Sequence, residues 1–215
     1  MGATLRISEI FYSLQGESAS VGYPTVFVRL TGCPLRCQYC DTAYAFSGGV
    51  IYQLDQILRE VQQYNTRHIT VTGGEPLAQP ACLPLLSLLC DEGYEVSLET
   101  SGALDMRGVD SRVIKVMDIK TPGSLEESKT LPENLDYLGP RDQVKFVICS
   151  HDDYLWSREK VVQTQLSAKV SDVFFSPSTP DISPRDLAEW ILEDQLDVRM
   201  QVQLHKILWG NEPGH

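Results

Sequence analysis

The chain has 215 residues, of which 42% are hydrophobic, and this is enough for one domain with a sizeable core. Its formal net charge of −11 argues against a broad nucleic-acid interface, because binding to a phosphate backbone depends mostly on Lys and Arg. No apolar run approaches the ~18 residues of a membrane span and no secretion signal is visible at the N-terminus, so we expect a cytoplasmic protein that acts on a small molecule.

Apolar patterns along the chain predict strands and helices that alternate. Strands are predicted at residues 7–12, 25–30, 68–72, 95–99, 113–119, 143–148, 173–176 and 198–204. Helices are predicted at residues 54–64, 84–90, 154–166 and 184–192, the last with Ser183 as N-cap and Pro184 in its first turn. The connections 101–112 and 121–141 look too irregular for a full helix.

Repeated strand–helix units imply a parallel sheet with right-handed crossovers. The predicted strands are too few to close an eight-stranded barrel. We therefore expect an α/β fold in a single domain, residues 1–215, built as an open partial (β/α) barrel of about six parallel strands.

The strand predicted at residues 25–30 carries an arginine among apolar residues. Alternation places Arg29 on the same face as Thr25 and Phe27. A buried Arg29 would need an anionic partner. An edge strand with a solvated Arg29 is the alternative that the sequence leaves open.

Three cysteines, Cys33, Cys37 and Cys40, follow this strand at the spacing Cys-x3-Cys-x2-Cys. A loop this short can curl around a small metal centre and present its sulfurs inward. A [4Fe–4S] cluster usually takes four cysteines, so three would leave one iron open to a non-protein ligand. Zinc would need a fourth ligand nearby, but the nearest downstream candidates are His68 and Cys82, and a disulfide is disfavoured without a secretion signal. We interpret the loop as a cluster site.

The other three cysteines, Cys82, Cys90 and Cys149, stand among Leu, Val and Ile. We expect them to be buried small hydrophobes. They are therefore left out of the cluster site.

Glycine-containing and polar loops follow the carboxyl ends of the predicted strands, which form the active site in parallel α/β folds. Besides the cysteine loop, they are Gly73-Gly74-Glu75-Pro76, Glu99-Thr100-Ser101-Gly102, Asp118-Ile119-Lys120, Ser176-Pro177-Ser178 and His205-Lys206. Gly73 and Gly74 can let backbone carbonyls approach a ligand, while Glu75 brings a carboxylate. We expect these loops to share one rim and one site.

The cysteine loop resembles the signature of the radical S-adenosylmethionine (SAM) superfamily, in which an aromatic residue such as Tyr39 usually precedes the third cysteine. The resemblance implies that Cys33, Cys37 and Cys40 ligate a [4Fe–4S] cluster whose open iron is chelated by SAM. One electron from the cluster would then give a 5′-deoxyadenosyl radical. The cofactor-binding positions implied are Gly73, Gly74 and Glu75, which hold the methionyl amino group, with Gly102, Asp118, Lys120 and Ser176.

A wider set of motifs looks like the 7-carboxy-7-deazaguanine synthase family. The matching segments are Leu14-Gln15-Gly16-Glu17, Arg29, Gly32-Cys33-Pro34, Cys40-Asp41-Thr42, the two strand-end motifs Gly73-Gly74-Glu75-Pro76 and Glu99-Thr100-Ser101-Gly102, Val144-Lys145-Phe146-Val147 and Gln203-Leu204-His205-Lys206. The resemblance runs almost end to end. It implies conversion of 6-carboxy-5,6,7,8-tetrahydropterin to 7-carboxy-7-deazaguanine with loss of ammonia, on the route to queuosine and related deazapurines.

Carried over by position, the resemblance gives the chain a short N-terminal substrate-binding extension and the pterin-binding residues Leu14, Gln15, Gly16, Glu17, Arg29 and Thr100. Thr42 would ligate a magnesium ion that also contacts the substrate carboxylate; the alternative for Thr42 is a helix N-cap. His205 is as compatible with a structural role as with a substrate contact. The resemblance further implies a homodimer and an external electron donor such as flavodoxin.

Ser18 stands where many members of this family have Gly, and Asp118-Ile119-Lys120 where many have Ser-Pro-Lys. Two other functions stay open. One is a radical SAM activase that acts on a protein glycine; the other is a non-enzymatic iron–sulfur carrier or zinc-binding module. Gln15, Glu17 and Arg29 favour the pterin enzyme, because their donors and charges suit a small carboxylated heterocycle.

Overall fold

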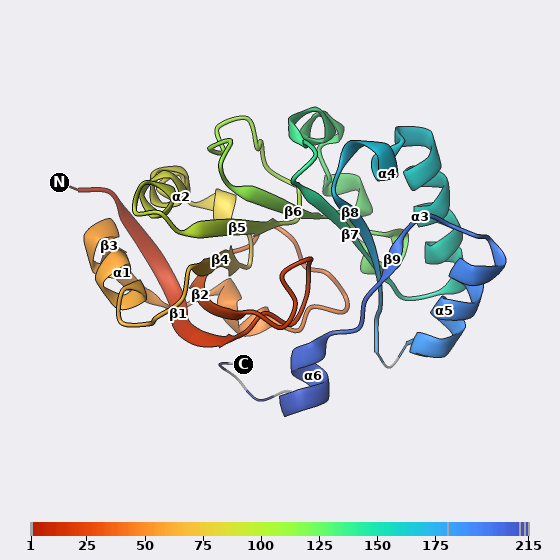
Figure 1. The fold of residues 1–215 in the computed structure, drawn as a ribbon, viewed down its shortest axis with the longest axis horizontal. Helices are drawn as coiled ribbons and strands as arrows, with labels where there is room; N and C mark the ends of the chain where they lie inside the picture. Colours follow the sequence, from red (N-terminus) through yellow and green to blue (C-terminus); the bar gives the residue numbers. More distant parts are fainter. Residues whose placement is uncertain (1, 180, 211, 213, 215) are drawn as a thin grey trace.

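The computed structural model describes residues 2–179, 181–210, 212 and 214. One nine-stranded sheet runs through the molecule in the order β3-β1-β2-β4-β5-β6-β7-β8-β9 (Figure 1). The strands are β1 Thr4–Leu14, β2 Pro24–Leu30, β3 Val50–Gln53, β4 His68–Gly73, β5 Glu95–Thr100, β6 Ile114–Asp118, β7 Gln143–Ile148, β8 Asp172–Pro177 and β9 Arg199–Met200. Neighbours from β2 to β9 are parallel, whereas β1 pairs antiparallel with β2 and with β3. The fold is the expected α/β open partial barrel, extended at one edge by β1 and β3.

The predicted helices are confirmed with small shifts at their ends. The α-helices are α1 Leu54–Val61, α2 Cys82–Asp91, α3 His151–Thr164, α4 Leu166–Lys169, α5 Pro184–Glu193 and α6 Leu204–Trp209. The Ser183 hydroxyl accepts the Asp186 N–H at 3.2 Å, so α5 begins as its N-cap and proline predict. No α-helix forms in the connections 101–112 and 121–141, all of whose residues are described, although the second contains three 3-10 helices, Pro122–Ser124, Glu127–Lys129 and Pro132–Tyr137.

Two strand predictions need correction at the sheet edges. The short edge strand β3 was not predicted; it pairs with Thr4–Ile7 of β1, a contact that local pattern does not show. The strand expected at residues 198–204 ends after Met200, because the Gln201 side chain turns to bind both backbone polar groups of Ser18, at 2.6 and 2.9 Å. Residues 205 and 206 therefore lie in the first turn of α6, not behind a strand.

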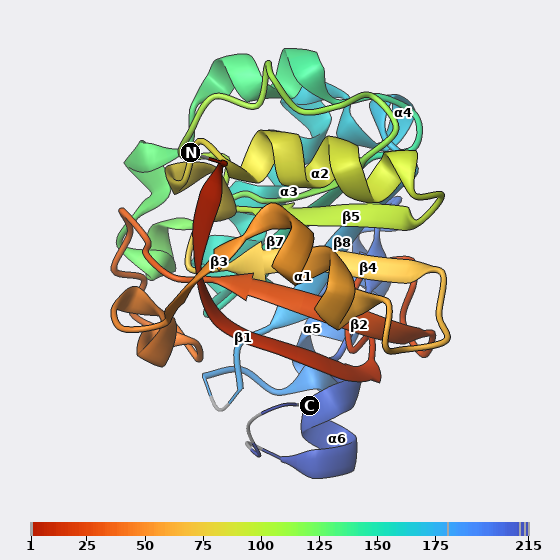
Figure 2. The same ribbon diagram turned by 90° about the vertical axis from the view of Figure 1, so that its left-hand side faces the viewer.

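Two hydrophobic clusters fix the helices to the outside of the sheet. Ile57 of α1 and Leu85 of α2 pack with strands β1, β2, β4 and β5, and Figure 2 shows both helices in front of these strands. Phe146, Phe175 and Leu187 belong to the second cluster, which joins β7 and β8 to α3 and α5. In contrast, α6 lies across the sheet from α2 (Figure 1). The inner face is thus left to α6 and the strand-end loops.

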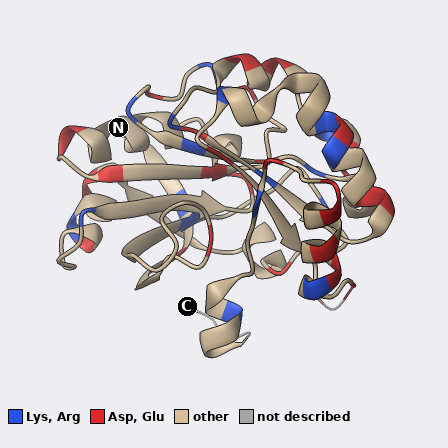
Figure 3. Cartoon of the chain, turned by 45° about the vertical axis from the view of Figure 1, so that its right-hand side comes forward, with Lys and Arg blue, Asp and Glu red and all other residues tan. Residues whose placement is uncertain are grey.

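Acidic and basic side chains are interspersed over the outer helices and loops. Figure 3 shows both red and blue positions on the outer helices, with no continuous basic stretch on the side in view. Within the described part of the chain, no helix combines the length and the apolar character that crossing a membrane requires.

Candidate active site

A cavity of about 1130 Å³ lies inside the curved sheet. The cysteine loop, the loops that follow β4 to β8, the segment from Leu14 to Glu17 and the start of α6 all contribute to its wall. Phe27 and Arg29 of β2 both line it, as the alternation along that strand predicts. The expected shared rim therefore exists, and segments more than 180 residues apart in the chain meet there.

Cys33, Cys37 and Cys40 all line this cavity as free, partly exposed thiols. Burial raises the pKa of Cys33, and it raises the pKa of Cys37 to about 11. Among the described residues, no three His, Cys, Asp or Glu side chains converge closely enough to hold a single metal ion. Cysteines that ligate a [4Fe–4S] cluster bind different irons and stand wider apart than the ligands of one ion. The three thiols are the donor type that an iron–sulfur cluster requires, and all three reach one cavity.

The loop after β4 packs directly on the cysteine loop. A Cβ at Gly74 would collide with the Gly32 backbone and the Cys33 side chain, so only glycine permits this approach. The Glu75 N–H donates to the Gly32 carbonyl at 2.8 Å. Gly73 and Gly74 line the cavity and can offer their backbone there.

Glu75 has a different position from the two glycines. Its side chain is fully buried, and its carboxylate accepts the Thr100 hydroxyl at 2.9 Å and the Ser101 N–H at 2.8 Å. Neither Glu75 nor Gly102 is among the residues that line the cavity, whereas Thr100 is. Glu75 thus ties the loop after β4 to the loop after β5.

Three polar atoms around the cavity have no partner within the described structure. They are the Tyr39 hydroxyl, Asp118 Oδ1 and Ser176 Oγ, all buried, on residues that line the cavity. A buried polar group without a partner costs about 1–3 kcal/mol. A ligand rich in hydroxyl, amino and carboxylate groups, as SAM is, would satisfy them. Asp118 and Ser176 are two of the positions expected to bind the cofactor.

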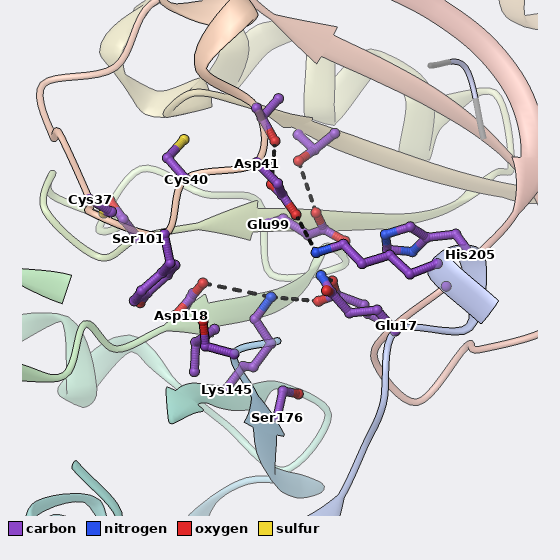
Figure 4. Close-up of a pocket in the computed structure, with 18 of the residues that line it drawn as sticks. Glu17, Cys37, Cys40, Asp41, Glu99, Ser101, Asp118, Lys145, Ser176 and His205 are labelled. Atoms are coloured by element: carbon purple, nitrogen blue, oxygen red, sulfur yellow. Dashed lines mark hydrogen bonds and ion pairs between the residues drawn. The ribbon is translucent and has the colours of Figure 1, made fainter. Parts of the chain in front are cut away.

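Four charged side chains form a row across the cavity floor, part of which Figure 4 shows. Lys145 Nζ lies 2.5 Å from Glu17 Oε2 and 3.6 Å from Asp118 Oδ2, which in turn lies 2.9 Å from Lys120 Nζ. Burial acts to raise the pKa of Glu17, but Lys145 and a hydrogen bond from Gln203 outweigh it, and the net pKa is lowered. Burial likewise opposes the ionised form of Lys145, yet its carboxylate neighbours leave its pKa raised. The row is therefore fully ionised at neutral pH.

Arg29 is held on the cavity wall. Its strand β2 lies between β1 and β4, so the alternative of a solvated arginine on an edge strand is wrong. Arg29 Nε donates to Glu9 at 2.7 Å, and the Tyr44 hydroxyl donates to the same carboxylate oxygen at 2.7 Å. Its guanidinium also lies 5.7 Å from the centre of the Phe11 ring.

Gln15 connects the N-terminal segment to the sheet. Its side-chain amide donates to Thr70 at 3.1 Å and to Glu99 at 3.3 Å, and its oxygen accepts the Glu17 N–H at 3.1 Å. Glu99, Lys145 and Gln203 line the cavity but were given no individual role from the sequence. The available signal for Glu99 was its place at the end of a predicted strand. For Lys145 and Gln203 it was their place in segments that carry the family resemblance.

The start of α6 covers the cavity beside the segment from Leu14 to Glu17. A Cβ at Gly16 would collide with the His205 ring, and the Leu204 N–H donates to the Gly16 carbonyl at 2.9 Å. Lys206 lies 3.2 Å from Asp41. Burial acts to raise the pKa of Asp41, but Lys206 and the Thr42 hydroxyl lower it to about 2.

Thr42 stands at the N-cap position of the 3-10 helix Ala43–Phe46 and lines the cavity. Its hydroxyl donates to Asp41 Oδ1 at 2.8 Å and does not cap that helix. The alternative of a side-chain N-cap at Thr42 is therefore not what the structure shows.

The three remaining cysteines are not alike. Cys82 is buried, as expected, whereas Cys90 and Cys149 are partly exposed, so the expectation of burial is wrong for these two. Cys149 follows β7 and lines the cavity, because the chain turns there into α3.

Comparison with known proteins gives consistent results. The model of the radical SAM superfamily matches residues 27–119. The 7-carboxy-7-deazaguanine synthase of Koribacter versatilis is 46% identical over 97% of this chain and 98% of its own length, and that of Chlorobaculum tepidum is 45% identical over 97% and 96%.

Solved structures agree on the fold. QueE from Escherichia coli superimposes with a TM-score of 0.78 over 94% of this chain and 95% of its own, at 24% identity. SuiB from Streptococcus suis, bound to its precursor peptide SuiA, gives 0.58 over 80% of this chain and 46% of its own, at 14% identity. Membership of the radical SAM superfamily implies a [4Fe–4S] cluster and SAM. The chain belongs to the 7-carboxy-7-deazaguanine synthase family of radical SAM enzymes.

Proposed function

We propose that the protein converts 6-carboxy-5,6,7,8-tetrahydropterin to 7-carboxy-7-deazaguanine with release of ammonia. The observation that carries the proposal is that Gln15, Glu17 and Arg29 line the same cavity as the three cysteines of the cluster loop. A hydrogen-bonding heterocycle with one carboxylate suits this mixture of amide, carboxylate and guanidinium groups.

Arg29 is the residue that we expect to bind the substrate carboxylate. The hydrogen bond that the structure shows for Arg29 uses Nε, which leaves the two terminal nitrogens for a bidentate contact. Gln15 and Glu17 are held in place by Thr70 and Lys145, so their polar groups are positioned before substrate binds. Leu14 and Gly16 complete this wall.

We assign the opposite side of the cavity to the cofactors. Cys33, Cys37 and Cys40 would hold the cluster, while Gly73, Gly74 and the unpartnered atoms of Asp118 and Ser176 would meet SAM. When bound, the cluster and SAM supply the one-electron chemistry that removes a hydrogen atom from the substrate. The walls of the cavity restrict which hydrogen is reached, because they hold the substrate in one orientation.

Thr42 is the proposed protein ligand of a magnesium ion. Because no cluster of three acidic, His or Cys ligands exists among the described residues, such an ion would take most of its oxygens from water and substrate. This is the usual pattern for Mg²⁺ in active sites. An external donor such as flavodoxin, a homodimeric assembly and a cytoplasmic location remain predictions.

Anaerobic reconstitution tests the assignment. The protein loaded with iron and sulfide should bind one [4Fe–4S] cluster and, with SAM, reductant and carboxytetrahydropterin, should form the deazaguanine product and ammonia. Cys37→Ala should lose the cluster, whereas the matched control Cys90→Ala, outside the cavity, should keep it. A tightly held zinc without iron would contradict the enzyme assignment. Formation of 5′-deoxyadenosine without any deazaguanine would contradict the substrate and bring back the activase.

A further inference from the structure

Two glutamates on the cavity wall have different partners. Glu17 forms an ion pair with Lys145 at 2.5 Å. Glu99, at the end of β5, forms no ion pair within the described part of the chain. Its carboxyl group meets two neutral donors instead, the Thr72 hydroxyl at 2.8 Å and the Gln15 amide at 3.3 Å. Figure 4 shows Glu99 and Glu17 near one another on this wall.

The surroundings of Glu99 raise its pKa above the ordinary value for glutamate. Burial raises the pKa of Glu99, and the negative charge of Glu17 raises it further. Lys145, the Thr72 hydrogen bond and Arg29 act in the opposite direction without reversing the shift. The pKa of Glu17 is lowered, so the pKa values of the two carboxyl groups are shifted in opposite directions. Such a separation within one site is how proteins create one acid and one permanent anion.

The proposed reaction needs a proton at the point where ammonia leaves. Its substrate loses the elements of one ammonia, so one nitrogen must gain a proton as its bond to carbon breaks. A ring carbon must also lose a proton. An unassisted amine anion is a poor leaving group, and a positioned acid contributes roughly 10²–10⁴-fold to such steps.

We propose that Glu99 is the catalytic acid of ammonia release, an inference that rests on the proposed function. The carbon–nitrogen bond breaks with its electron pair going to nitrogen, and the nitrogen takes the carboxyl proton of Glu99. The carboxylate then accepts the proton of the adjacent ring carbon, whose bonding electrons form the new double bond. Glu99 ends as it began, and the step needs no oxidant or reductant.

The geometry supports this role in a second way. Thr72 of β4 and Gln15 of the N-terminal segment each donate a hydrogen bond to one oxygen of Glu99, and these two contacts hold the carboxyl group on the cavity wall. Gln15 in turn accepts the Glu17 N–H at 3.1 Å, which links the acid to the substrate-binding segment. The acid is thus positioned by the same residue that we expect to contact the pterin.

The resting protonation state can be measured without cofactors. Infrared spectra of the cluster-free protein at pH 7 should contain the carbonyl stretch of a protonated carboxylic acid that disappears in Glu99→Gln. The matched control is Glu95→Gln on the same strand, whose carboxylate pairs with Arg67 at 3.3 Å. The control should retain the band. A wild-type protein without such a band, or a band unaffected by Glu99→Gln, overturns the proposal whatever the substrate proves to be.

Turnover measurements distinguish acid catalysis by Glu99 from a purely structural role of this residue. With ring-deuterated substrate, Glu99→Gln should still transfer deuterium to 5′-deoxyadenosine, but ammonia release should fall by about 100-fold or more. Glu99→Asp keeps a proton donor and should recover part of the loss, while Glu95→Gln should behave as the wild type. Ammonia release within about threefold of wild type in Glu99→Gln, or an equal loss of both steps, would refute the inference. A wild type that forms no deazaguanine would instead refute the proposed function.

Discussion

Replacement of Lys145 by methionine should be among the most destabilising single changes in this cavity. The substitution keeps most of the side-chain length but removes the cation between Glu17 and Asp118, at 2.5 and 3.6 Å. The three side chains are between 15 and 19% exposed, so solvent cannot replace the lost charge well. Removing one partner of a buried ion pair costs about 3–5 kcal/mol. Because Asp118 keeps Lys120 at 2.9 Å, we place the loss at the lower end, about 3 kcal/mol at pH 7.

The same change should alter how stability depends on pH. In the wild type the pKa of Glu17 is lower in the folded than in the unfolded protein. Its contribution to stability is therefore present above the pKa of the unfolded protein and is lost as the pH falls through the pKa of the folded protein. In Lys145→Met, burial acts on Glu17 without its cation and raises that pKa. Protonation of Glu17 then removes the unpaired buried charge and with it part of the destabilisation. The difference between the two proteins should therefore shrink as the pH falls from 7 towards about 4.3, the ordinary value for glutamate.

Urea denaturation of the cluster-free proteins at several pH values measures both effects. Arg59→Met is the matched control, because Arg59 pairs with Asp55 at 2.8 Å on the surface, with both side chains more than 60% exposed. Such a pair contributes about 1 kcal/mol or less. A Lys145→Met protein no less stable than this control, or a difference that stays constant with pH, would refute the reasoning.

The remaining predictions concern three other residues. Arg29→Lys should lower turnover by roughly 10- to 100-fold, because a charge-assisted hydrogen bond contributes about 1.5–3 kcal/mol, while iron and sulfide content stay unchanged; normal turnover would remove Arg29 from substrate binding. Thr42→Ala should abolish the response of the rate to magnesium and leave SAM binding intact; an unchanged magnesium dependence would place the ion elsewhere. Ser18 has a left-handed φ of 65°, so in urea denaturation Ser18→Gly should be about 1 kcal/mol more stable than Ser18→Ala; equal stability would show that no backbone strain is stored there.

The sequence determined those features that depend on residues close together in the chain. The spacing of Cys33, Cys37 and Cys40 indicated a cluster site, because a short loop limits where its sulfurs can lie. Alternation in β2 placed Arg29 on the cavity face, and Ser183 with Pro184 marked the start of α5. Strand–helix repeats were sufficient for the fold class, since parallel strands require crossovers. The expected arrangement of polar loops on one rim followed from the same rule.

Tertiary structure decided what depends on distant partners. Local pattern could not show that β2 lies inside the sheet, that Gln201 ends β9 by binding Ser18, or that the Glu75 carboxylate is buried between two loops. It also could not separate Glu17 from Glu99, since both are glutamates in polar motifs. Glu17 gains its cation from a lysine 128 positions away, whereas Glu99 meets neutral donors. Charge state in a protein interior is set by what folding brings within a few ångströms, and the sequence of a single segment does not contain that information.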